Sequence, residues 1–168
     1  MAKILAFDQS SKLTGWSLFE DNIYRDSGVI DKHKMSDAGE RIGEMGIAIC
    51  KKIKEIKPDC VIIEDVQAQS GVSTVILLSR LQGFILGWCY VQNIRTEIIK
   101  PSEWRSLLHF KQGAGVKRKE LKEQGINYIK NKYRLDLSED ECESICINDA
   151  ARIKYLFDIS EDDLWEMV

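Results

Sequence analysis

Two short apolar runs, each ending in a carboxylate, constrain the fold of this chain more than any other feature. Lys3–Asp8 (KILAFD) and Cys60–Glu64 (CVIIE) are of strand length, and the second is the β-branched run typical of a strand covered on both faces. A charge at the end of a buried strand is costly unless a cation or a hydrogen-bond donor compensates it. If the two strands lie side by side, both carboxylates meet at one edge of a sheet.

The remaining strand and helix signals follow an order that predicts an α/β fold. Leu13–Glu20 and residues 22–31 are predicted as two further strands joined by turn residues around Asp21, which makes the first three strands an antiparallel meander. A fifth strand is predicted over Arg95–Ile99. Helices are predicted from Ser36 to Pro58, over residues 74–91, from Pro101 around Trp104, over residues 117–133, and from Ser138 to about Phe157. This order predicts a mixed five-stranded sheet with helices on its faces.

The length and composition predict one ordinary globular domain. We assign residues 1–157 of the 168 to that domain and residues 158–168 to an acidic tail. Hydrophobic residues make up 44% and charged residues 30%, which argues against collagen-like, disordered and coiled-coil classes. No apolar run approaches the roughly 18 residues of a membrane span, and the start of the chain lacks a signal-peptide pattern, so we expect no membrane contact and a cytoplasmic location. Five cysteines without a CxxC pair, together with two histidines, argue against a zinc site.

Charge is strongly segregated along the second half of the chain. Residues 100–134 contain 10 Lys or Arg and 3 Asp or Glu, whereas residues 135–168 contain 2 basic and 11 acidic residues. A basic segment beside an acidic one predicts a polyanion-binding face next to a cation-binding site. The alternative is a pair of helices with complementary charges that pack against each other.

The last predicted helix supplies two more carboxylates for a candidate metal site. Asp140 and Glu143 lie three residues apart and therefore share one helix face. If these two meet Asp8 and Glu64, four carboxylates repel one another unless divalent cations lie between them. Oxygen ligands of this kind suit Mg²⁺, with Mn²⁺ as a substitute, and two such ions about 4 Å apart form the two-metal site of phosphodiester hydrolysis.

Each of these acids also has a simpler explanation. Asp8 could cap the turn that follows it, and Glu64 could pair with Lys3 or Lys57. Acids in the first turn of a helix are favoured by the helix dipole in any case. Asp149 is a competing ligand on the last helix. It follows Glu143 by six residues, roughly 240° around the helix, so the two cannot easily serve one site, and we favour Glu143.

The basic segment predicts a contact with a phosphate backbone. Gly113–Gly115 leads into a predicted helix that opens with Lys117, Arg118 and Lys119, and helix N-termini with cations bind phosphates. Arg105 adds charge nearby. The loop lacks the GxxxxGK[ST] pattern of a nucleotide-binding P-loop, so we expect no nucleotide cofactor. Tryptophans such as Trp104 could stack on unpaired bases, although partly buried packing is the simpler explanation.

These residues together resemble the RuvC-type Holliday-junction resolvases. Residues 4–16 (ILAFDQSSKLTGW) are similar to the family's opening strand–turn–strand, and residues 61–64 (VIIE) are similar to the segment that ends in its second catalytic acid. The resemblance extends to residues 79–83, to Gly113–Gly115 with Lys119, and to residues 140–143. The family usually has glycine where this chain has Ser10, a terminal aspartate where it has Glu143, and, in bacterial members, a junction-probing aromatic where it has Gln67. These departures suggest a divergent, phage-like member, which would act in the host cytoplasm.

The resemblance implies an RNase H-like fold and a homodimer that nicks two opposed strands of a four-way DNA junction, in recombination and repair, with Mg²⁺. It implies catalytic and metal-binding roles for the four acids Asp8, Glu64, Asp140 and Glu143. It also implies DNA contacts by Arg105, Lys117, Arg118 and Lys119. A candidate dimer surface is the apolar helix around Ile76, Leu77, Phe84 and Trp88, which is too hydrophobic for one buried face.

Two other classes of protein fit parts of this pattern. A phosphotransferase of the actin and sugar-kinase fold also opens with an apolar strand that ends in aspartate, but it would need a second domain and a phosphate loop that 168 residues do not provide. A non-catalytic module that binds branched DNA would keep the fold without the metal chemistry.

Overall fold

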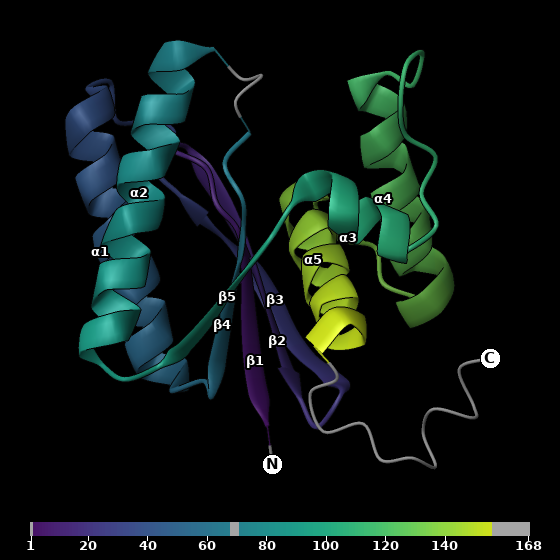
Figure 1. Ribbon diagram of the computed structural model, residues 1–168, viewed down its shortest axis with the longest axis horizontal. Coiled ribbons are helices and arrows are strands. Elements are labelled where there is room, and N and C mark those ends of the chain that lie inside the picture. Colours follow the sequence, from purple (N-terminus) through teal and green to yellow (C-terminus); the bar gives the residue numbers. More distant parts are fainter. Residues whose placement is uncertain (1, 68–70, 156–168) are drawn as a thin grey trace.

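The computed structural model describes residues 2–67 and 71–155 and is built around a five-stranded mixed sheet (Figure 1). The strands lie in the order β3-β2-β1-β4-β5. Their bounds are Lys3–Asp8 for β1, Leu13–Glu20 for β2, Ile23–Asp31 for β3, Cys60–Glu64 for β4 and Arg95–Ile99 for β5. The helices are α1 Ala38–Ile56, α2 Val72–Val91, α3 Pro101–Leu107, α4 Arg118–Tyr133 and α5 Glu139–Tyr155.

The central strand β1 joins the antiparallel and parallel halves of the sheet. It pairs antiparallel with β2, which pairs antiparallel with β3, and it pairs parallel with β4, which pairs parallel with β5. Along β1 the side chains alternate between two buried faces, Ile4 and Ala6 on one and Leu5 and Phe7 on the other. Because both faces of β1 are buried, its sequence is a continuous apolar run. The predicted mixed five-stranded sheet with helices on both faces is confirmed.

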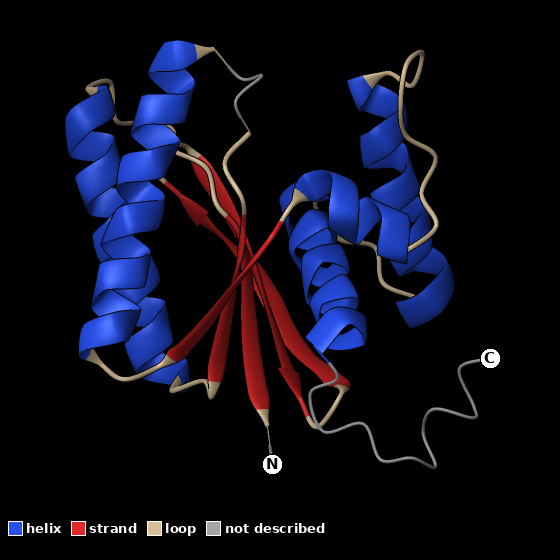
Figure 2. Ribbon diagram, viewed as in Figure 1, coloured by secondary structure: helices blue, strands red, loops and turns tan. Residues whose placement is uncertain are grey.

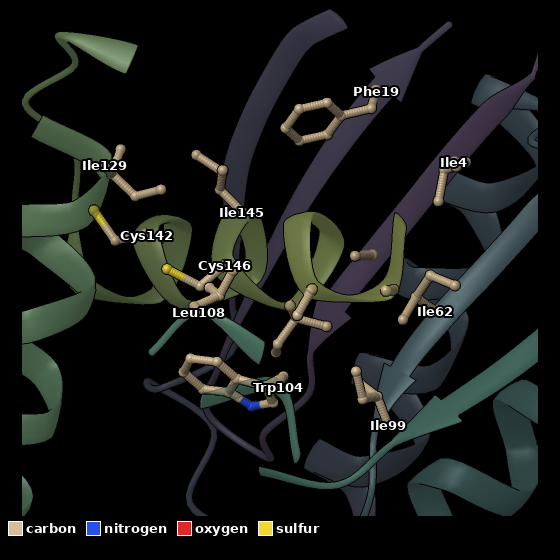
Figure 3. Close-up of a cluster of buried hydrophobic side chains, with 14 of the residues drawn as sticks. Ile4, Phe19, Ile62, Ile99, Trp104, Leu108, Ile129, Cys142, Ile145 and Cys146 are labelled. Atoms are coloured by element: carbon tan, nitrogen blue, oxygen red, sulfur yellow. The ribbon is translucent and has the colours of Figure 1, made fainter. Parts of the chain in front are cut away.

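Helices cover the two faces of the sheet differently (Figure 2). The pair α1 and α2 lies on one face, and α5 lies on the other, with α3 and α4 packed beside it. The core under α5 combines sheet residues such as Ile4 and Ile62 with Trp104 of α3 and Ile145 of α5 (Figure 3). The segment that follows the sheet is therefore anchored on the same face as the last helix.

Local signals set the ends of the elements. Asp21 and Asn22 both have positive φ, as a two-residue hairpin turn requires. The Ser138 hydroxyl and the Glu141 carboxylate form a capping box at the start of α5, where Ser138 Oγ lies 2.7 Å from Glu141 Oε2. Helix α1 begins at Ala38, two residues after its predicted start at Ser36, and the Asp37 carboxylate caps it by accepting a hydrogen bond from the amide of Glu40.

Helix α2 and the end of the chain differ from the other segments in how they compare with the sequence-based expectations. By length and composition α2 could cross a membrane, so the expectation that no segment is apolar and long enough is wrong. This helix is part of the folded core, however, because Leu81, Ile85 and Cys89 pack against the sheet and α1. The predicted helix end at Phe157 and the predicted tail over residues 158–168 lie outside the described residues.

Candidate active site

Asp8 and Glu64 lie next to each other at one edge of the sheet. They end the neighbouring parallel strands β1 and β4, whose register pairs Phe7 with Ile63 one residue earlier. Parallel neighbours place their carboxyl ends at the same edge, so the topology alone brings these two acids together. This is the geometry that the two apolar runs predict.

The first turn of α5 brings Asp140 and Glu143 to the same edge. Gly15 of β2 pairs with Asp8 across the sheet, and a Cβ at this position would lie 1.9 Å from the carbonyl oxygen of Asp140. No side chain fits there, so glycine is what allows the helix start to approach the strand so closely. Farther along the helix, the Asn148 amide donates to the carbonyl oxygen of Ile4 at 3.2 Å.

The four acids line one cavity of about 660 Å³, together with basic and polar side chains. Its acidic lining is Asp8, Glu64, Glu139, Asp140 and Glu143, and its basic lining is Arg105, Arg118 and Lys122. Gln9, Ser10, Ser11 and Gln67 also line it. The cavity therefore offers carboxylate oxygens from β1, β4 and α5 and positive charge from α3 and α4.

Burial in this cavity makes the carboxylates costly to ionise. It raises the pKa of Asp8 well above the ordinary value, and repulsion from the three neighbouring carboxylates raises it further. Burial also raises the pKa of Glu64 to about 7, although a hydrogen bond from Trp104 and the charge of Arg105 oppose that shift. Burial raises the pKa of Asp140 as well, against the lowering effect of Lys122.

The donor set fits Mg²⁺ in its chemistry. Mg²⁺ binds hard oxygen ligands such as carboxylates. Its positive charge would reduce the repulsion among the buried carboxylates. Within the described ranges, no three His, Cys, Asp or Glu side chains are already grouped as a metal site. The carboxyl group of Glu143 lies close enough to Asp8 for their side-chain hydrogen bond to contribute to the raised pKa of Asp8.

Asp149 is not part of this cavity. It is 1% exposed and accepts hydrogen bonds from the hydroxyls of Tyr128 at 3.0 Å and Tyr133 at 2.7 Å. It also pairs with Lys132 at 3.1 Å and with Arg152. Every one of these partners lies on α4 or α5, so Asp149 ties the two helices together and does not compete with Glu143 for the site.

The predicted DNA-binding cations divide into two groups. Arg105 and Arg118 line the cavity. Lys117 and Lys119 do not; the Lys119 side chain is 86% exposed and pairs with Glu123 at 3.7 Å. Lys122 lines the cavity and pairs with Glu139, but the sequence analysis missed it. Its place four residues after Arg118, on the same helix face, is the signal that could have found it.

Two side chains that hold Glu64 were also missed. The Trp104 indole N–H donates to Glu64 Oε1 at 2.7 Å. The Gln9 side chain accepts from the Glu64 amide at 3.1 Å and donates to the Glu64 carbonyl oxygen. Gln9 could have been found as the neighbour of Asp8 at the strand end, whereas no sequence pattern links Trp104 to an acid 40 residues away.

Sequence comparison finds similarity to proteins named RuvC. The chain is 22% identical over 155 residues to "Crossover junction endodeoxyribonuclease RuvC" of Nitratidesulfovibrio vulgaris, which covers 85% of this chain and 88% of that protein. It is 26% identical over 121 residues to the protein of the same name in Pelodictyon phaeoclathratiforme. That match covers 70% of this chain and 62% of the relative, so it spans less than two thirds of the relative's length. No protein-family model matches the chain.

Solved structures share the fold at low sequence identity. The T. thermophilus RuvC in complex with a Holliday junction substrate matches with a TM-score of 0.72 and 12% identity, over 94% of this chain and 97% of that one. The Fowlpox virus resolvase, solved with substrate Holliday junction DNA, matches with a TM-score of 0.57 and 20% identity, over 90% of this chain and 98% of that one. Sequence similarity along most of the chain and this shared fold together make the chain similar, at low identity, to the RuvC-type resolvases.

Proposed function

We propose that this protein is a structure-specific endonuclease that resolves four-way and related branched DNA, in recombination and repair, by paired nicks in opposed strands. The observation that carries the proposal is the meeting of Asp8, Glu64, Asp140 and Glu143 from three separate elements in one cavity with a basic wall. The similar proteins are named crossover junction endodeoxyribonucleases, and the similar structures include complexes with Holliday junctions.

We further propose that the four acids hold Mg²⁺, as two ions per site. When bound there, Mg²⁺ would activate a water molecule and stabilise the charge that develops on the phosphate oxygens. The protein's own contribution is to keep the carboxylate oxygens together at fixed positions. The β1–β4 register fixes Asp8 beside Glu64, and the close contact at Gly15 fixes the first turn of α5 against them.

The basic wall of the cavity, formed by Arg105, Arg118 and Lys122, would bind the DNA backbone. Arg105, Arg118 and Lys122 lie where they would contact the phosphates that flank a backbone segment entering the cavity. Lys117 and Lys119 lie at the start of α4, outside the cavity, and would extend this contact along the strand. Such contacts supply affinity with little sequence information, which suits an enzyme that recognises the shape of a junction.

We also propose that the active form is a homodimer that associates through α2. This helix carries five exposed apolar residues, Val72, Ile76, Phe84, Tyr90 and Val91. Only 17% of its most apolar 18-residue stretch is buried. Gly83 and Gly87 leave open space on the helix surface, so a second helix could approach closely. Figure 1 shows α2 on the side of the sheet away from α4, although Thr74 and Leu78 at the start of α2 line the cavity. A second copy related by a two-fold axis would give two sites for the two opposed strands.

The proposal is tested with a synthetic four-way junction. We expect the purified protein to make paired symmetric cuts when Mg²⁺ or Mn²⁺ is present and none in EDTA. Asp8→Asn should bind the junction with unchanged affinity and fail to cut it, because it loses a carboxylate and keeps the basic wall. Cleavage by Asp8→Asn at the wild-type rate would contradict the assigned site. Junction binding by the wild type without cleavage in either metal would instead indicate a non-catalytic binding module.

A further inference from the structure

Two different parts of the Trp104 side chain act on the active-site cavity. Its indole N–H donates to Glu64 Oε1 at 2.7 Å. The guanidinium of Arg105 lies over its ring face, with Cζ 4.7 Å from the ring centroid. Both partners line the cavity, one as a carboxylate and the other as a cation of its basic wall. The indole therefore touches the metal-binding and the DNA-binding parts of the site at once.

The packing around Trp104 holds the indole in one orientation. The side chain is 1% exposed, in the core between the sheet and α5 (Figure 3). Its ring meets Phe110 edge-on, with centroids 5.8 Å apart, and Phe110 meets Tyr128 of α4 in the same way at 5.7 Å. A buried ring in such contacts cannot rotate without opening the core. The N–H vector is therefore fixed by residues that do not belong to the cavity.

The hydrogen bond from the Trp104 indole restricts the orientation of the Glu64 carboxylate. Because the indole occupies one oxygen of Glu64, rotation of the carboxylate is restricted and the second oxygen remains available to a cation. The backbone of Glu64 is held as well: its carbonyl oxygen accepts from the Gln82 amide at 3.2 Å, and its own amide donates to Gln9. Groups that orient a metal ligand in this way typically change metal affinity by about 10-fold to 100-fold.

Trp88 shows that burial of an indole in this protein does not by itself require such a partner. Its Nε1 is buried without a hydrogen-bond partner in the described structure, and its ring packs against the core on the α1–α2 side of the sheet. Trp88 as a whole is only partly buried, so the two tryptophans share a buried N–H and differ in what that N–H contacts. This pair provides a matched control.

We propose that Trp104 is a positioning residue that orients Glu64 for cation binding through its N–H and Arg105 for phosphate contact through its ring face. The inference rests on the proposed nuclease function and assigns a role within that same site. It separates into two parts that different substitutions isolate. Trp104→Phe removes the N–H and keeps an aromatic face, whereas Trp104→Leu removes both.

The experiment measures Mn²⁺ binding to the DNA-free protein by calorimetry and junction binding in EDTA by fluorescence anisotropy. We expect Trp104→Phe to weaken Mn²⁺ binding about tenfold and to leave junction affinity in EDTA unchanged. Trp104→Leu should weaken Mn²⁺ binding equally and also weaken the junction complex about threefold, because the cation–π contact of Arg105 is lost. Trp88→Phe should change neither quantity. Unchanged Mn²⁺ binding in Trp104→Phe would overturn the inference.

A second measurement does not depend on the folding of the Trp104 variants. In a ¹H–¹⁵N spectrum of the wild type, the Trp104 indole signal should move when Mg²⁺ is added and should be displaced in Glu64→Ala, whereas the Trp88 signal should stay in place. A Trp104 indole signal that keeps its position both on addition of Mg²⁺ and in Glu64→Ala would overturn the inference. If the wild type binds Mn²⁺ as expected but does not cut junctions, the nuclease proposal fails and the orientation of Glu64 stands. If it binds no Mn²⁺, both fail.

Discussion

At the residue scale, the active-site acids lower the stability of the metal-free protein. Burial and mutual repulsion raise the pKa values of Asp8 and Glu64 above their ordinary values. In the folded protein each of them therefore holds its proton more tightly than in the unfolded chain. The site works against folding whenever it is ionised without a cation.

We expect Glu64→Gln to stabilise the metal-free protein at pH 8 by on the order of 2 kcal/mol. The folded pKa of Glu64 is about 7 against an ordinary 4.5, so its stabilising contribution is complete below pH 4.5 and is lost as the pH rises through 7. Urea unfolding between pH 5 and pH 8 in EDTA measures this. The wild type should lose stability over that range, and the variant should lose less.

Glu103→Gln is the control for this experiment. Glu103 lies on α3 and pairs with Lys154 at 2.9 Å, which lowers its pKa. Removal of that charge should give no gain at pH 8. Equal stabilities for wild type and Glu64→Gln at pH 8 would mean that the carboxylate is not desolvated as the structure indicates.

We expect Lys122→Gln to reduce the rate of junction cleavage about tenfold and Lys119→Gln no more than about twofold. Lys122 lines the cavity beside the acids, whereas Lys119 is 86% exposed and outside it. Single-turnover cleavage, with junction affinity measured in EDTA, separates the two residues. A larger loss for Lys119→Gln would place the scissile phosphate outside this cavity.

The sequence predicted some of these residues and not others, for a physical reason. Asp8 and Glu64 stand out because a charge that ends an apolar strand needs a partner, which is a local pattern. Helix geometry indicated that Glu143 and Asp149 cannot serve one site, and Glu143 was favoured because it lies in the first turns beside Asp140. The structure places Asp149 among tyrosines and cations away from the cavity. Trp104 could not be found in that way, because its contact with Glu64 depends on how α3 packs on α5.

At the element scale, the site depends on the contact between β2 and the first turn of α5. The strand bounds of β1, β2, β4 and β5 were predicted correctly from the period-two and apolar patterns. The docking of α5 was not predictable, because it requires the backbone of Asp140 to lie against Gly15 from a distant part of the chain. A glycine inside a strand often indicates such a close approach of another backbone segment.

We expect Gly15→Ala to destabilise the protein by about 3 kcal/mol and to abolish cleavage. The new Cβ would lie 1.9 Å from the carbonyl oxygen of Asp140, and a clash with backbone cannot be relieved by rotating a side chain. Denaturant unfolding and junction cleavage measure the two effects. Gly43→Ala is the control, because a Cβ there meets nothing within 4 Å and lies in α1, where alanine is favoured. A stable and active Gly15→Ala would mean that α5 can move without loss of the site.

At the scale of the whole molecule, most of α2 and the helix α5 lie on opposite faces of the sheet, although Thr74 and Leu78 of α2 line the candidate active-site cavity. The apolar surface of α2 lies on one side of the sheet, and the basic wall with α5 lies on the other (Figure 1). The length and the order of elements predicted a single mixed sheet, but they could not assign helices to its faces, since that depends on which side of each strand is buried against which helix.

We expect Ile76→Glu to convert the dimer to a monomer and to uncouple the paired nicks, so that junctions are cut in one strand per binding event. Ile76 is 45% exposed on α2, and a charge there would be buried at the proposed interface. Ile23→Glu is the control, because Ile23 is 56% exposed on β3, outside that surface. Sedimentation velocity gives the oligomeric state and a supercoiled cruciform plasmid reports nick pairing. A dimer that persists in Ile76→Glu would exclude this face of α2 as the interface.

The order of the acids along the chain has a consequence for a growing polypeptide. Asp8 and Glu64 are synthesised early, whereas Asp140 and Glu143 lie on α5, the last of the described helices. A ribosome-bound chain that has exposed only the strands and α1 to α4 holds two of the four candidate ligands and lacks the helix that completes the cavity. The proposed nuclease site is therefore incomplete until translation has passed residue 143.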